Sequence, residues 1–317
     1  MWKLLAKVGV SALLIWLLLR GQDVGALWRQ LLAVERVHLI AAAIALWLLA
    51  IPSALRWSKI LEAMGKPLGL RATFPLVLIG LFFNLTLPSS FGGDAVRMWK
   101  ANRVGLPAAT AVLSVMVDRI TALAALLLLV LAALPLFFAR VADVRAEIGV
   151  LLLLGVGFLG FAVAMTLDKL PVSLRRFRLV RGIAQLSAEL RKVLLVPSRA
   201  APTLFYSLVN QGGAIIVVAV LAKGLGLSVS WSDCLIIVPL AILATVIPIS
   251  VAGWGVREQA FVTGFGLLGV PAGGALTLSV LFGLVNTVIS LPGGLVWLAS
   301  SDRRAGKNRM NIGMDGE

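Results

Sequence analysis

Cysteine and histidine are almost missing from this sequence, which contains only Cys234 and His38. One cysteine cannot form an intramolecular disulfide, and the two residues together are too few to build a zinc site. We therefore expect neither a metal nor another cofactor. A Ser-His-Asp hydrolase is not expected either, because the single histidine lies far from the polar motifs described below.

Acidic residues are also scarce, with 14 Asp and Glu against 29 Lys and Arg, which gives a net charge of +15. Such an excess can indicate a nucleic-acid partner. Here, however, 60% of the residues are hydrophobic and the mean hydropathy is +1.01, far above the soluble range. The basic residues lie between apolar runs, as in the loops of membrane proteins. This pattern excludes a nucleic-acid partner.

The apolar runs are long enough to cross a membrane, which needs roughly 20 mostly apolar residues. The first run follows Lys3 and Lys7 as in a signal peptide, but no small-residue cleavage site follows it, so we expect a retained span. The sequence predicts an all-α polytopic membrane protein with about six full spans. These spans cover residues 4–19, 39–61, 108–138, 148–167, 203–223 and 271–300.

Two short stretches of the chain are similar to each other. They read LPSSFGGDAVR at residues 87–97 and IPISVAGWGVR at residues 247–257. Arg257 follows Arg97 by 160 residues, and one Pro, Ser, Gly and Val recur at the same interval. Proline and glycine break helices, and charge within a membrane is costly, so such stretches mark transport paths. We therefore predict two re-entrant hairpins, at residues 72–97 and 233–258.

Charge placement predicts the topology. The connector at residues 168–200 is basic and amphipathic, and the tail at 301–317 is basic, so both should be cytoplasmic, as should the N-terminus. The two hairpins then enter from opposite sides, which makes residues 1–147 and 148–300 an inverted-topology repeat. Two alternatives stay open for the connector, which either lies on an anionic lipid surface or packs against the bundle.

Arg97 and Arg257 are the strongest candidates for substrate binding. A guanidinium group fits phosphate or carboxylate and keeps its charge. Neighbouring glycines would leave backbone N–H groups free to hold an anion, and a serine recurs in each stretch. These additional candidates are Gly92, Gly93, Gly253, Gly255, Ser90 and Ser250.

Further charged residues accompany these arginines. Asp94 and Glu258 each lie close in sequence to one of them, and are either ion-pair partners or proton sites. Asp118 and Arg119 are adjacent on one predicted span and cannot face each other, so each needs a partner elsewhere. Arg56 is a candidate partner for Asp118.

The motifs taken together resemble a known family. The pattern NxxLPxxxGGDxxR at residues 84–97, the later Asp118-Arg119 pair and GxGxRE at 253–258 are similar to the flippase-like transmembrane family, the MprF-like transmembrane module of lysylphosphatidylglycerol synthases. The resemblance covers about residues 4–300. It implies translocation of a lipid in a bacterial cytoplasmic (inner) membrane. In bifunctional members a separate soluble domain performs aminoacyl transfer, and we expect this chain to lack it.

We therefore expect a lipid transporter or flippase, not an enzyme, that moves a phospholipid or a polyprenyl lipid between leaflets. A homo-oligomer is compatible with this function. Two alternatives remain. One is a non-transporting partner of a lipid-synthesis enzyme, bound through the basic helix at residues 173–196. The other is an intramembrane lipid-modifying enzyme that uses Asp94 and Glu258.

Overall fold

The computed structural model describes residues 23–87, 92–169, 177–246 and 253–301, together with Gly9, Leu13, Trp16 and Leu18–Arg20 near the N-terminus. Over this part of the chain the structure is entirely helical, as predicted. The helices are α2 (Val24–Leu32), α3 (Arg36–Leu48), α4 (Ala50–Ala63), α5 (Leu70–Thr86), α6 (Gly92–Arg103), α7 (Ala108–Arg140), α8 (Val144–Ala164), the 3₁₀ turn η1 (Leu167–Lys169), α9 (Arg178–Leu194), α10 (Pro197–Gly224), α11 (Trp231–Ala244), α12 (Val256–Leu267) and α13 (Ala272–Ser301).

Five helical segments are long and apolar enough to cross a membrane: α3 with α4, α7, α8, α10 and α13. They confirm the last five predicted spans, whereas the first, at residues 4–19, lies largely outside the described residues. Apolar side chains face outward from several of these helices, and Val156 and Leu159 on α8 are about two-thirds exposed. Lipid is the solvent that fits such surfaces. The protein is a multi-pass membrane protein.

The junction of α3 and α4 is held by a polar contact from α10. Pro52 follows this junction and lacks an N–H, so the local helical hydrogen bonding is incomplete. The amide of Asn210 donates to the carbonyl of Leu49 at 2.9 Å and to the hydroxyl of Ser53 at 2.7 Å. This is a polar helix–helix contact of the kind that membrane proteins use between spans.

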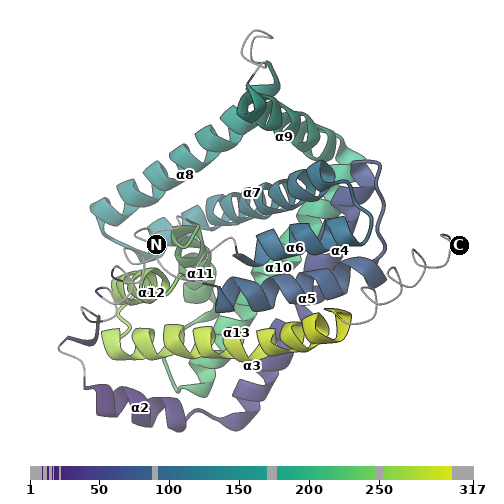
Figure 1. Cartoon of the computed structure of the whole chain (residues 1–317). Helices are drawn as coiled ribbons and strands as arrows, with labels where there is room; N and C mark the ends of the chain where they lie inside the picture. Colours follow the sequence, from purple (N-terminus) through teal and green to yellow (C-terminus); the bar gives the residue numbers. More distant parts are fainter. Residues whose placement is uncertain are drawn as a thin grey trace, which may run out of the picture.

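Two pairs of short helices occupy equivalent places in the chain order. The helices α5 and α6 pack together before α7, and α11 and α12 pack together before α13. The breaks inside the pairs contain residues 88–91 and 247–252, which lie outside the described residues. Figure 1 shows α5 and α6 towards one end of the bundle and α11 and α12 towards the other.

The long helices α7 and α13 each contact both pairs. Near its start, α7 contacts α6 through Arg119, and near its end it contacts α11 through Arg140. In the same way α13 contacts α12 through Ser279 near its start, and α5 through Trp297 near its end. Each long helix therefore joins the second helix of its own pair to the first helix of the other.

The connector helix α9 packs against the bundle with its apolar face. Leu190 and Val193 are fully buried against Ile60 of α4 and Val117 of α7. On its polar side Arg191 forms an ion pair with Asp168 at 2.9 Å. The packed arrangement left open by the sequence is therefore present, and contact of the same helix with an anionic lipid surface stays a prediction.

Candidate functional site

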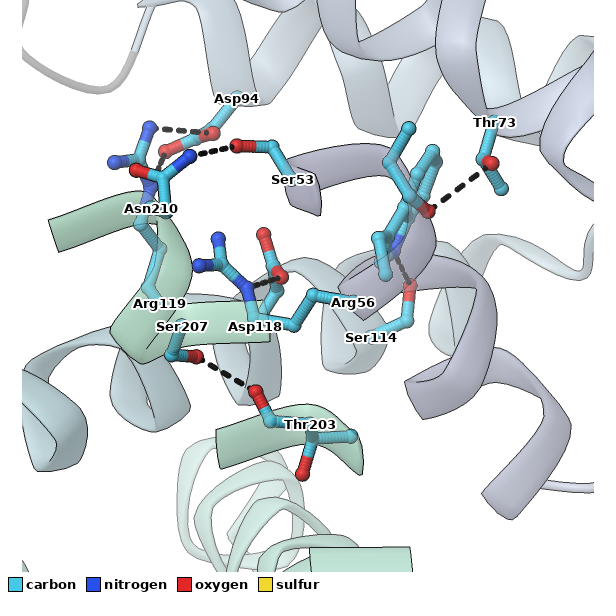
Figure 2. Close-up of polar contacts among 12 residues, drawn as sticks. Ser53, Arg56, Thr73, Asp94, Ser114, Asp118, Arg119, Thr203, Ser207 and Asn210 are labelled. Carbon is cyan, nitrogen blue, oxygen red and sulfur yellow. Dashed lines mark hydrogen bonds and ion pairs between the residues drawn. The ribbon is translucent and has the colours of Figure 1, made fainter. Parts of the chain in front are cut away.

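A group of five charged side chains, which we call the first site, lies where α4, α6 and α7 meet. The Asp118 carboxylate accepts a hydrogen bond from Arg56 Nε at 2.7 Å and another from Arg97 Nη2 at 2.8 Å. Asp118, Arg97 and Arg56 are only 1%, 6% and 8% exposed. The predicted pairing of Asp118 with Arg56 is thus present (Figure 2). Arg97 pairs with the same buried carboxylate, which therefore bridges two guanidinium groups.

Asp94 forms the third ion pair of this group. Its two carboxylate oxygens accept from Arg119 Nε at 2.7 Å and from Arg119 Nη2 at 2.9 Å (Figure 2). The partner is therefore Arg119 of α7 and not Arg97, the arginine of its own motif. Arg97 lies one turn further along α6, where Asp118 holds it. Asp94 is buried, whereas the Arg119 side chain is 47% exposed.

The group as a whole carries one unbalanced positive charge. The five residues Arg56, Asp94, Arg97, Asp118 and Arg119 comprise three cations and two anions, which leaves one positive charge. The Arg97 guanidinium stacks on the ring of Trp57 at 4.1 Å, and its Nε atom is buried without a hydrogen-bond partner among the described residues. A buried N–H donor usually has an acceptor, so this atom is an unsatisfied donor of the group among the described residues.

Trp57 is a site residue that the sequence reasoning missed. It is fully buried, and its Nε1 donates to the Ser114 hydroxyl of α7 at 3.2 Å. That hydrogen bond fixes the indole ring beneath Arg97, where the ring face attracts the cation. The available signal was its position directly after Arg56 in a predicted span.

The glycines of the first motif allow close packing, and the Gly93 N–H is not free. The Gly93 N–H donates to Asn84 Oδ1 of α5 at 3.0 Å. A Cβ atom at Gly93 would overlap the carbonyl oxygen of Gly80, and one at Gly92 would overlap the Leu87 side chain. These contacts hold α6 flush against α5 and so place Arg97 beside Asp118. The predicted anion contact by the Gly93 N–H is not available in this structure.

The second site is formed by α12 and α13. The Arg257 guanidinium contacts Glu258 Oε1 through Nη2 and donates from Nε to the Ser279 hydroxyl at 3.2 Å. Arg257 lies against the Trp254 and Phe282 rings. Glu258 is 1% exposed and forms the predicted pair with Arg257. Ser279 was not predicted, because its partners lie more than 20 residues away in sequence.

The glycines of the second motif allow backbone conformations that other residues avoid. Gly253 and Gly255 have φ angles of +80° and +88°, in the region that side-chain-bearing residues avoid. The Gly255 N–H donates to Glu258 Oε2, so Glu258 caps the start of α12 as well as neutralising Arg257. As at Gly93, this N–H is not free for an anion. The predicted contributors Ser90 and Ser250 both lie outside the described residues.

An apolar cavity of about 290 Å³ adjoins the second site. Its walls come from the N-terminal segment, α2, α13 and the ring of Trp254, and Glu258 and Thr277 are its polar residues. Gln30 of α2 accepts a hydrogen bond from Thr277 at 3.0 Å at this place. The cavity therefore connects a hydrocarbon-like space to the Arg257–Glu258 pair.

The two sites fall within a recognised family region. The sequence matches the family model described as lysylphosphatidylglycerol synthase TM region over residues 4–293. The chain belongs to this family. A search of curated proteins returned no match. The lysylphosphatidylglycerol synthase TM region includes both charge clusters and every helix from α2 to most of α13. Within the described residues no group of three or more His, Cys, Asp or Glu forms a metal site.

Proposed function

We propose that this protein is a transporter that moves a phosphate-bearing lipid, either a phospholipid or a polyprenyl lipid, between the leaflets of a bilayer. The observation that carries the proposal is an arginine in each of the two short helix pairs, the buried Arg97 and the largely buried Arg257, whose side chain is 11% exposed. Each arginine lies beside a carboxylate in the interior of a membrane protein. Ionisable groups at such depth mark substrate paths. Enzymatic activity is not part of the proposal.

The arrangement of the helix pairs supports alternating access. α5 has 17 residues and α11 has 14, which is too short for an untilted crossing. Each pair would enter the membrane and return to the same side as a re-entrant hairpin. The contacts of α7 and α13 place the pairs towards opposite ends of the bundle, as Figure 1 also shows. This is the pattern of an inverted repeat, in which substrates bind between the halves.

The depth of each site fits a head-group path. Asp118 is ten residues from Ala108, the start of α7, and Ser279 is seven residues from Ala272, the start of α13. At about 1.5 Å per residue these positions lie roughly 15 Å and 10 Å into their spans. The hydrocarbon core is about 30 Å thick. Because α7 and α13, with 33 and 30 residues, are longer than this core, the two arginines would meet the head group in its outer parts, from opposite sides.

The first site can accept an anion without leaving either carboxylate unpaired. Asp118 can stay with Arg56, and Asp94 can stay with Arg119, while Arg97 transfers to a phosphate oxygen. The result would be three neutral pairs, whereas the site without ligand keeps one positive charge. A planar guanidinium group is suited to phosphate recognition, and acyl or prenyl chains would remain in the surrounding lipid.

The family and the charge pattern suggest the setting. We propose a bacterial cytoplasmic membrane with both termini in the cytoplasm, so that α5 and α6 open inward and α11 and α12 open outward. A homo-oligomer is compatible with this proposal but is not required by it.

Translocation in proteoliposomes tests the proposal. Fluorescent phosphatidylglycerol in the inner leaflet becomes accessible to an impermeant reductant only after it crosses. Arg97→Gln and Arg257→Gln should each abolish protein-dependent movement, because each removes one head-group cation. Arg103→Gln is the matched control, since Arg103 is an exposed arginine at the end of α6 that stacks on Trp99.

Unchanged movement in both test variants would refute the assignment of the two arginines. Folding of each variant is checked by size-exclusion chromatography. The assay also separates the alternatives, because a covalently altered lipid recovered from purified protein would indicate an intramembrane enzyme. Absence of movement with wild-type protein, combined with co-purification of a lipid-synthesis enzyme, would indicate a non-transporting partner.

A further inference from the structure

The two sites differ in charge balance. The first site holds three arginines and two aspartates, whereas the second holds one cation and one anion, Arg257 and Glu258. We infer that an anionic lipid head group binds Arg257 together with one proton, which Glu258 takes up as the head group replaces it. This inference rests on the proposed function and specifies how its second site is controlled.

Glu258 occupies the place that an anion would take. Its Oε1 atom accepts hydrogen bonds from Arg257 Nη2 and Nε, and another from the Ser279 hydroxyl at 3.3 Å. Its Oε2 atom receives the Gly255 N–H. Because Glu258 already accepts the hydrogen bonds of the Arg257 guanidinium group, a second anion can bind there only if these hydrogen bonds break.

A carboxylate that loses Arg257 cannot remain charged where it is. Glu258 is 1% exposed, and a buried charge without a partner costs several kcal/mol. A buried acid in this position takes up a proton instead. The protonated carboxyl can then donate to the Ser279 hydroxyl while its other oxygen keeps the Gly255 N–H. The second site would stay neutral before and after the head group binds.

No other described group near Glu258 can supply the missing charge. On α13 the neighbouring polar groups are the hydroxyls of Ser279 and Thr277. The part of α11 against α12 includes the apolar residues Ile237 and Leu240, and the α2 residues that line the cavity are apolar. Among the described residues, Arg257 is the only ion-pair partner of Glu258.

The first site needs no proton for the same event. Asp118 keeps Arg56 when Arg97 turns to a phosphate, so no carboxylate is left unpaired. Head-group binding should therefore depend on pH at the second site and not at the first. Uptake of one proton on binding predicts that the dissociation constant rises by up to about tenfold per pH unit.

Binding measurements with fluorescent phosphatidylglycerol in detergent test the inference. The phosphodiester of this probe lacks the second acidic proton of a phosphomonoester, which titrates near about pH 6, so it keeps one negative charge between about pH 5 and about pH 8. Arg97→Gln confines binding to the second site. Glu258→Gln removes the proton acceptor, yet its amide oxygen still accepts from the Gly255 N–H. The control is Glu62→Gln, at an exposed carboxylate paired with Lys59.

In the Arg97→Gln protein, affinity should fall by up to about tenfold per pH unit over this range. Adding Glu258→Gln should remove that dependence and keep high affinity throughout, whereas adding Glu62→Gln should leave the dependence unchanged. The Glu258→Gln comparison is repeated with Arg97 present, where the pH-dependent part of the binding should also disappear. This second comparison does not require the Arg97 variant to fold.

Binding that does not vary with pH, or a dependence that survives Glu258→Gln, would overturn this inference and leave the proposed function intact. Absence of binding to wild-type protein at every pH would overturn both.

Discussion

Replacing Asp118 by asparagine should be among the most destabilising single changes in this protein. Asparagine has nearly the same shape as aspartate, so packing is kept and only the charge is lost. The variant leaves the Arg56 and Arg97 guanidinium groups buried without their shared carboxylate. The nearest other acid, Asp94, is already held by Arg119 through two hydrogen bonds and cannot replace it.

The magnitude follows from burial. Breaking a buried ion pair by removing one partner costs about 3–5 kcal/mol, because the other charge stays uncompensated. Asp118 is 1% exposed and both arginines are less than 10% exposed, so water cannot compensate them. At about 2–4 °C per kcal/mol for a chain of this order of size, the melting temperature should fall by roughly 10 °C.

The assay is thermal unfolding of the detergent-solubilised protein, followed by loss of helical circular dichroism. Glu62→Gln provides the matched control, because Glu62 forms its ion pair with Lys59 where both side chains are about half exposed. An exposed pair contributes about 0–1 kcal/mol, so this variant should melt within a few degrees of the wild type.

A double variant tests whether the two unpaired arginines cause this loss of stability. Adding Arg56→Gln to Asp118→Asn removes one of the two stranded charges, so the double variant should melt higher than Asp118→Asn alone. If Asp118→Asn lowered the melting temperature no more than Glu62→Gln does, the bridging carboxylate would not be the element that holds α4, α6 and α7 together, and the reasoning would be wrong.

Three further changes have defined expectations, each measured by thermal unfolding and lipid translocation. Gly93→Ala should abolish translocation, because its Cβ would collide with α5, whereas Gly182→Ala on the open face of α9 should be neutral. Gly255→Ala should destabilise by about 1–2 kcal/mol, because its φ of +88° strains a residue with a side chain. Trp57→Phe should cost about 1–2 kcal/mol, because it removes the hydrogen bond to Ser114 and weakens the stacking under the arginine.

Hydropathy and charge were sufficient to predict the membrane spans. The runs at 108–138 and 203–223 contain few charged residues, and they correspond to α7 and α10 within a few residues at most ends. Such signals are local, since a span must be apolar over its own length. The breaks at the two motifs were also visible, because proline and glycine act on the backbone where they stand.

Partner choice in the charged group was harder to predict. Asp118 and Arg56 were matched correctly because few charges lie within the spans. Asp94 was expected beside Arg97, three residues along its own helix, but its partner is Arg119 of α7. Sequence distance cannot decide between them, because the choice depends on how closely α6 packs against α5 and how α7 crosses both.

The glycines of the two similar stretches have different structural roles. At Gly93 the helix is regular and the absent Cβ makes room for the α5 backbone, whereas at Gly255 the residue is needed for a positive φ. Both N–H groups are used by side chains, of Asn84 and Glu258 respectively. The two similar stretches therefore share an arginine but not the contacts around it.

Because the two sites differ in charge, the lipid head group should bind more strongly at one of them during the proposed transport cycle. A site with a surplus buried cation gains stability when an anion arrives, since the anion supplies the missing partner of Arg97. A site that is already neutral must first open the Arg257–Glu258 pair, and so binds the same anion more weakly unless a proton accompanies it. At neutral pH the lipid head group should therefore reside mainly at Arg97, and acidification on the side of Arg257 should draw it across.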